Sequence, residues 1–100
     1  MEQRYLYVML MDNGHALTLD VVQRHVEHLR AMDGQGKLFA CGPFMDYPGG
    51  MVILKASSIQ EAHQIAQSDP FIREGFKIYS IRTLEWAHQG NNYGLMDEEA

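Results

Sequence analysis

Residues 19–43 decide the fold of this chain and read LDVVQRHVEHLRAMDGQGKLFACGP. Apolar residues recur at helical spacing in the first part, the glycines at 34 and 36 stop a helix, and the last part is typical of a strand that ends in Gly-Pro. The apolar face of the helix carries Val21, Val22, Val26, Leu29 and Met32. We therefore expect an amphipathic helix that begins after Thr18 and ends near Asp33, followed by a strand over 37–43.

His25 falls on the apolar face of this helix, between Leu29 and Met32. A ring nitrogen that is buried without a hydrogen-bond partner costs about 1–3 kcal/mol. The position of His25 therefore predicts a polar partner on another element. His28, one turn further on, falls at the border of the same face.

The composition indicates one globular domain. A chain of 100 residues, 46% hydrophobic and 21% charged, is long enough for a single core, and its net charge of −5 argues against a nucleic-acid partner. The longest uncharged hydrophobic run, 5–11, is much shorter than the roughly 20 residues that cross a bilayer, and no signal-peptide pattern is present. With one cysteine and no internal disulfide, we expect a cytoplasmic protein without a membrane partner.

The rest of the sequence predicts strands over 4–11, 51–56 and 76–86. Ser58-Ile-Gln-Glu61 is a capping box that begins a second helix, and Asp69 caps the short turn 70–74 that follows it. Turn residues in 44–50 join the second and third strands as a hairpin.

The resulting order, β-α-β-β-α-β, is typical of the ferredoxin-like α+β sandwich, in which two helices cover one face of a four-stranded antiparallel sheet. An RNA-binding function does not fit, because the third strand lacks the aromatic and basic pattern that stacks bases. We expect a domain over 1–86 and a C-terminal tail over 87–100.

The first strand is apolar on both faces, since Leu6, Val8 and Leu10 alternate with Tyr5, Tyr7, Met9 and Met11. An antiparallel sheet usually has one face exposed to water. A strand that is apolar on both faces therefore needs another element or subunit to pack against its second face. We expect that cover to be a second subunit, in a homodimer formed through the open sheet face. Tyr7 and Met9 are expected on this open face, where they either line a ligand pocket or pack the dimer.

Several features together resemble the YciI-like family, also called YCII-related proteins. They are His25 on the helix, Gly42-Pro43 seventeen residues later, the Gly-Gly-Met-Val-Ile strand, the Ser-x-x-Glu-Ala helix start and Asp69-Pro70-Phe71, and they span about residues 4–86. The resemblance implies a dimeric α+β barrel with a pocket beside a His–Asp pair, here His25 and Asp69. Some relatives remove hydrogen chloride from chlorinated lactones, and the related muconolactone isomerases move a proton within a lactone ring.

A histidine held by a carboxylate is a suitable general base, because the carboxylate sets the ring tautomer and stabilises the imidazolium. A lyase or isomerase of this kind takes the proton beside a lactone carbonyl, and backbone N–H groups around Gly42 are candidates to stabilise the enolate oxygen. The residues expected to bind the substrate are Tyr7, Met9, His28, Gly42 and Pro43.

Alternative interpretations remain open. Asp69 can simply cap a turn and His25 can be a core histidine with a satisfied hydrogen bond, in which case the protein is a non-enzymatic module for ligand binding or assembly. His25 and His28 form a His-x-x-His pair, but zinc needs three or four ligands, and we expect neither a metal ion nor another cofactor. Cys41 is expected to be a small buried side chain in a strand, and Arg24 and Arg82 either bind an anionic substrate or are solvated.

Overall fold

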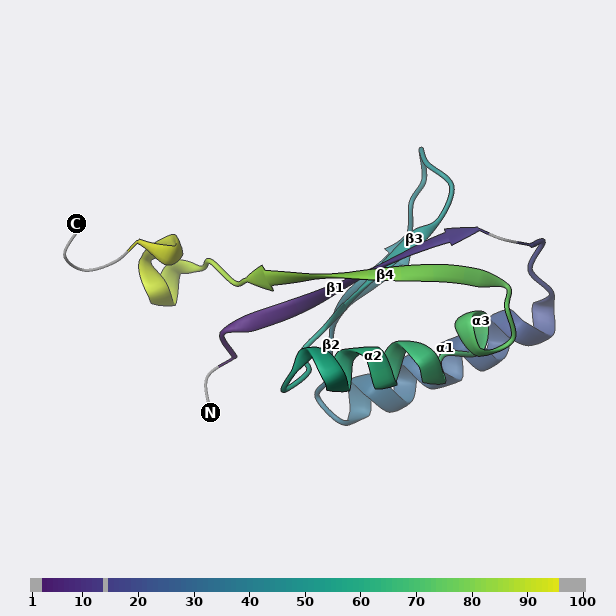
Figure 1. Cartoon of the computed structure of the whole chain (residues 1–100), viewed down its shortest axis with the longest axis horizontal. Coiled ribbons are helices and arrows are strands. Elements are labelled where there is room, and N and C mark those ends of the chain that lie inside the picture. The colour runs from purple at the N-terminus through teal and green to yellow at the C-terminus, as the bar shows by residue number, and fades with distance from the viewer. Residues whose placement is uncertain (1–2, 14, 96–100) are drawn as a thin grey trace.

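The structure, a computed structural model, describes residues 3–13 and 15–95. Within these residues a four-stranded sheet lies over a layer of helices (Figure 1). The strands are β1 (Tyr5–Asn13), β2 (Leu38–Pro43), β3 (Gly50–Leu54) and β4 (Lys77–Glu85). The helices of the layer are α1 (Leu19–Gly34), α2 (Ile59–Ser68) and the short α3 (Pro70–Arg73).

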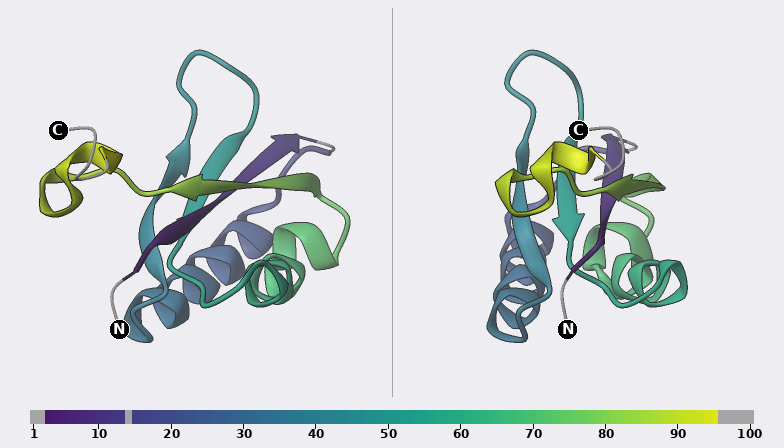
Figure 2. Two further views of the ribbon diagram at one scale, coloured as in Figure 1. Left: turned by 60° about the vertical axis from the view of Figure 1, so that its left-hand side comes forward. Right: turned by 90° about the vertical axis from the view of Figure 1, so that its left-hand side faces the viewer.

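The sheet has the strand order β2-β3-β1-β4, and every neighbouring pair is antiparallel. The helices cover one face only, as the rotated views show (Figure 2). The two central strands are β3 and β1, and β2 joins β3 as a hairpin with a register shift between Leu38 and Ala40. This arrangement confirms the predicted ferredoxin-like α+β fold.

Local signals account for the ends of α1. The Thr18 hydroxyl accepts a hydrogen bond from the Val21 N–H at 3.1 Å, and Asp20 places a negative charge in the first turn, where the helix dipole favours it. At the other end Gly36 has φ +73°, a conformation that glycine adopts without strain. The chain then turns so that the Lys37 N–H donates to the Met32 carbonyl at 2.9 Å.

The start of α2 differs slightly from the predicted capping box. The Ser58 hydroxyl accepts from the Glu61 N–H at 3.1 Å, as expected. The Glu61 carboxylate, however, accepts from the N–H of Ser57 at 2.8 Å, one residue before the cap. Glu61 also binds Lys37 Nζ at 3.0 Å, so this cap connects α2 to the segment before β2.

The main core lies between the sheet and the helices. Its buried members come from all layers and are Tyr7, Met9, Met11, Val21, Val52, Leu54, Ala56, Ala62, Ile65, Ala66 and Phe71. The expectation that Tyr7 and Met9 lie on the open face is therefore wrong. They pair in the ladder with Leu54 and Val52 and face the helices, where their long side chains fill the space beneath α1 and α2.

The open face of the sheet carries the other set of β1 side chains. Leu6 is 2% exposed although it is outside the main core, and Val8 and Leu10 are half-buried. Phe39 and Trp86 meet edge-to-face at 5.4 Å between ring centroids. Beyond β4 the chain forms a 3₁₀ segment, η1 (Gln89–Gly94), which projects past the end of the sheet in Figures 1 and 2.

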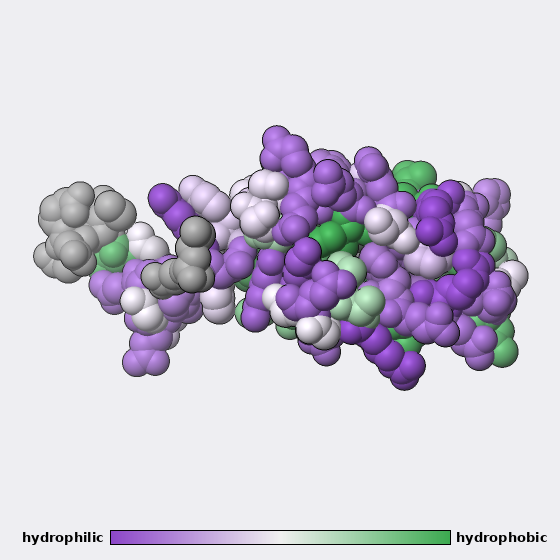
Figure 3. Space-filling model, turned by 90° about the horizontal axis from the view of Figure 1, so that it is seen from below, coloured by the Kyte–Doolittle hydropathy of each residue, from purple (hydrophilic) through white to green (hydrophobic). Residues whose placement is uncertain are grey.

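The outer surface of the helical layer is mostly hydrophilic, with apolar patches between the helices (Figure 3). None of the helices described at 3–13 and 15–95 has the length and apolar character needed to cross a membrane. The last residues of the expected tail, 96–100, lie outside the described part of the chain.

Candidate active site

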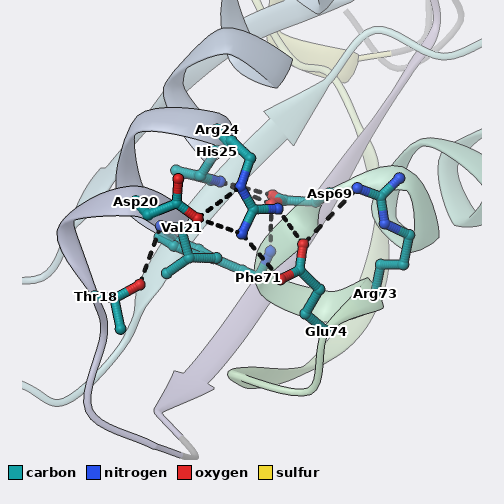
Figure 4. A network of polar contacts seen from close by, with 9 residues as sticks. All are labelled: Thr18, Asp20, Val21, Arg24, His25, Asp69, Phe71, Arg73 and Glu74. Atoms are coloured by element: carbon teal, nitrogen blue, oxygen red, sulfur yellow. Dashed lines mark hydrogen bonds and ion pairs between the residues drawn. The ribbon is translucent and has the colours of Figure 1, made fainter.

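The buried partner of His25 is Asp69. His25 lies in the middle of α1, and Asp69 lies at the junction of α2 and α3. Both oxygens of the Asp69 carboxylate are 2.9 Å from His25 Nδ1 (Figure 4). Asp69 is only 1% exposed and His25 only 9% exposed. A neutral His25 that donates Nδ1–H to this carboxylate carries its lone pair on Nε2.

Asp69 has a second role in the same place. Its Oδ1 accepts a hydrogen bond from the Phe71 N–H at 3.0 Å and so caps α3, whose first residue is Pro70. The Phe71 ring stacks on the His25 ring, with 3.9 Å between centroids and 11° between planes. Asp69 therefore both caps a helix and pairs with the histidine, and the imidazole is held by contacts at its edge and on its face.

His25 lines a cavity of about 390 Å³ between α1 and the sheet. A cavity of this size suits a small organic molecule. Apart from His25 and Lys77, the side chains around it are apolar or belong to Cys41. Nε2 of His25 forms no hydrogen bond with residues 3–13 or 15–95.

The profile of the YCII-related domain family matches residues 5–86. The chain belongs to the YCII-related family. The uncharacterised protein YjpA of Bacillus subtilis is 32% identical to it over 82 residues, which are 82% of this chain and 94% of YjpA. The fold is similar to that of 5-chloro-2-hydroxyhydroquinone dehydrochlorinase from Burkholderia phenoliruptrix, solved in complex with 2,5-dihydroxybenzoquinone. The TM-score is 0.61 at 20% identity, and the match covers 87% of this chain and 98% of that one.

In this YCII-related protein the other residues predicted to bind substrate are distributed unevenly. Gly42 and Pro43 line the cavity, on the strand opposite α1. Met9 does not line it, and Tyr7 lines a different cavity, of about 490 Å³, beside Lys37 and Glu61. His28 is half-buried outside the cavity, and this burial lowers its pKa.

Lys77 and Phe71 line the cavity, although the sequence did not predict a role there for either. Lys77 is the first residue of β4 and Phe71 lies in α3, and both are buried. The alternation of side chains along β4 could have indicated the position of Lys77. Lys77 lies on the same face of this strand as Tyr79 and Ile81, which pack against the core. Cys41 also differs from expectation, since it is exposed and lines the cavity.

A second polar layer lies beside the buried pair. Arg24 of α1 binds Asp20 on its own helix and Glu74 just after α3 (Figure 4). The hydrogen bonds from Arg24 lower the pKa of Glu74, and those to Glu74 and Asp20 raise the pKa of Arg24. Within the described residues, no three His, Cys, Asp or Glu side chains are grouped so that they could hold a metal ion.

Proposed function

We propose that this YCII-related protein binds a small organic molecule in the cavity beside His25, and that His25 and Asp69 act on it as a general base. The observation that supports this proposal best is that the two nitrogens of the His25 ring have different surroundings. Nδ1 is held by a buried carboxylate, while Nε2 is unbonded within the described residues and the ring lines an apolar cavity.

The proposed reaction begins with a proton on a carbon beside the carbonyl of a lactone-like substrate. Nε2 accepts this proton and becomes part of an imidazolium that the Asp69 carboxylate stabilises. The electron pair of the broken C–H bond moves into an enolate. Return of the proton at another carbon completes an isomerisation, whereas departure of a group such as chloride from the neighbouring carbon completes an elimination.

The named activity of the structural relative guides the choice of compounds. That enzyme is a dehydrochlorinase, and its solved complex holds 2,5-dihydroxybenzoquinone. We therefore propose chlorinated lactones, muconolactones and hydroxylated rings as the first compounds to test for binding and turnover.

We also propose that the protein forms a homodimer through the open sheet face. Val8, Leu10 and Ile53 are only partly buried there, and Leu84 and Ile78 on β4 are 45% and 69% exposed. An apolar sheet face of this kind is typical of an interaction surface, and its partner in this proposal is a second copy of the chain.

The test follows proton exchange, because it does not depend on a leaving group. Candidate lactones are incubated in D₂O with wild-type protein, with His25→Ala and with the exposed-site control His15→Ala, and deuterium incorporation is followed by NMR. We expect His25→Ala to slow exchange by about 100-fold or more and His15→Ala to leave it unchanged. Saturable binding without exchange or turnover favours a ligand-binding module, and full exchange by a folded His25→Ala variant contradicts the catalytic role.

A further inference from the structure

The side chain of Lys77 points into the helical layer, where a charged group is unexpected. The residue is the first of β4 and pairs with Asn13 at the end of β1. By strand alternation it faces the same side as Tyr79 and Ile81, which pack against the core. It is 7% exposed and lines the same cavity as His25.

The surroundings of the ammonium are mostly apolar. Lys77 Nζ lies 4.8 Å from the centre of the Phe71 ring, the ring on which His25 is stacked. It has no hydrogen bond or ion pair with residues 3–13 or 15–95, unlike Lys37, whose Nζ is 3.0 Å from the Glu61 carboxylate. Burial lowers the pKa of Lys77, while the Asp69 carboxylate raises it in part.

Lys77 Nζ is not fully enclosed, but an ammonium that has lost part of its hydration among apolar side chains is stabilised when an anion or another strong acceptor lies beside it. The contact with Phe71 compensates only in part, because a cation–π interaction is weak compared with the hydration of an ammonium. The remaining lining of the cavity is apolar apart from His25 and Cys41. A ligand that fits such a site combines an apolar ring with an anionic oxygen.

We propose that Lys77 is a ligand-binding residue that selects small anionic molecules, with its ammonium bound to a carboxylate, phenolate or enolate oxygen while the apolar walls hold the ring. This inference rests on the proposed binding of a small molecule beside His25. It adds the chemical class of the ligand, and it gives the charge that develops on an enolate oxygen a partner within the cavity.

The experiment compares benzoate with benzamide, two probes of similar shape that differ in charge. Binding to wild-type protein and to Lys77→Met is measured by calorimetry and by shifts of the cavity methyl groups of Val52 and Met51. We expect the wild type to prefer benzoate by about tenfold or more, and we expect Lys77→Met to lose this preference while benzamide affinity stays the same. Lys55→Met, outside the cavity, should behave as wild type.

Each outcome decides between the two proposals. Equal binding of both probes to the wild type, or a preference for benzoate that survives in Lys77→Met, overturns the role of Lys77 and leaves the proposed function intact. Binding of neither probe overturns both. Where Lys77→Met does not fold, the ¹³Cε and ¹⁵Nζ resonances of wild-type Lys77 serve instead, and shifts caused by benzoate but not by benzamide support the proposal.

Discussion

Arg24 and Glu74 form a two-pronged ion pair that joins α1 to the residue after α3. The neighbouring residue on α1, His25, joins the same helix to Asp69 at the start of α3. The two pairs lie beside one another in Figure 4, the first at the surface and the second buried. The outer pair therefore helps to hold together the two elements that position the inner one.

Replacing Glu74 by Gln should destabilise the fold slightly, and more at low than at high salt. The Arg24–Glu74 pair lies at the surface, where its charges face solvent and are screened by ions. Thermal unfolding of Glu74→Gln, of the exposed-site control Glu27→Gln and of wild type is compared at about 10 mM and about 1 M NaCl. A melting-temperature difference that does not change with salt would contradict this account.

Replacing Asp69 by Asn should keep the cap of α3 while removing the carboxylate that pairs with His25. The amide oxygen can still accept from the Phe71 N–H, but the amide NH₂ then faces His25 Nδ1 and favours the tautomer with its proton on Nε2. We expect a folded protein whose proton-exchange rate is reduced by about 10²–10⁴-fold. Ring ¹⁵N shifts of His25 report the tautomer.

Asp69→Ala removes both roles at once and serves as the comparison. It deletes the cap and leaves a buried ring nitrogen without its acceptor, so unfolding should cost about 1–3 kcal/mol less than in wild type. Full proton exchange by the Asn variant would show that the pair is structural only.

The contacts of Glu61 are expected to make the stability of the fold depend on pH. The hydrogen bond from the Ser57 N–H, and next the one from Lys37, lower the pKa of Glu61 in the folded protein. A lowered folded-state pKa means that this contribution is complete above the ordinary carboxyl pKa of about 4.3 and is lost as the pH falls through the folded-state value. Glu61→Gln should thus be less stable than wild type at pH 7 and equal to it in strong acid, as measured by urea unfolding. An equal difference at both pH values would refute the assignment.

Phe71→Leu tests whether the stacked ring orients His25. The substitution keeps an apolar side chain but removes the stacking and the contact with Lys77, with an expected loss of about 1 kcal/mol in stability. The rate of proton exchange should fall by more than the loss of stability accounts for, because the imidazole of His25 is then held only by Asp69. Phe44→Leu, in the loop between β2 and β3, is the matched control, and equal exchange rates in both variants would argue against a positioning role.

Ile53→Glu tests the proposed dimer. Ile53 lies between Val8 and Ala40 on the open face, so a carboxylate at this position would be buried in the interface. Light scattering should give the mass of two chains for wild type and for Gln64→Glu on the exposed side of α2, and the mass of one chain for Ile53→Glu. A single-chain mass for the wild type would exclude the dimer.

The sequence alone determined the elements and the fold, because the signals involved are local. The caps at Thr18 and Ser58, the glycine stop after α1 and the turn before β3 act within a few residues of the backbone they control. The burial of His25 was also predictable, because the position of a side chain on a helix follows from its spacing to its neighbours.

The partner of His25 could not be derived from spacing, since Asp69 lies 44 residues away and only the family resemblance suggested it. The tertiary structure alone decided which face of β1 meets the helices, and it placed Lys77 beside Phe71. The physical reason is that alternation separates the two faces of a strand without saying which one is inside when both are apolar. That choice is made by the packing of helices that are distant in the sequence.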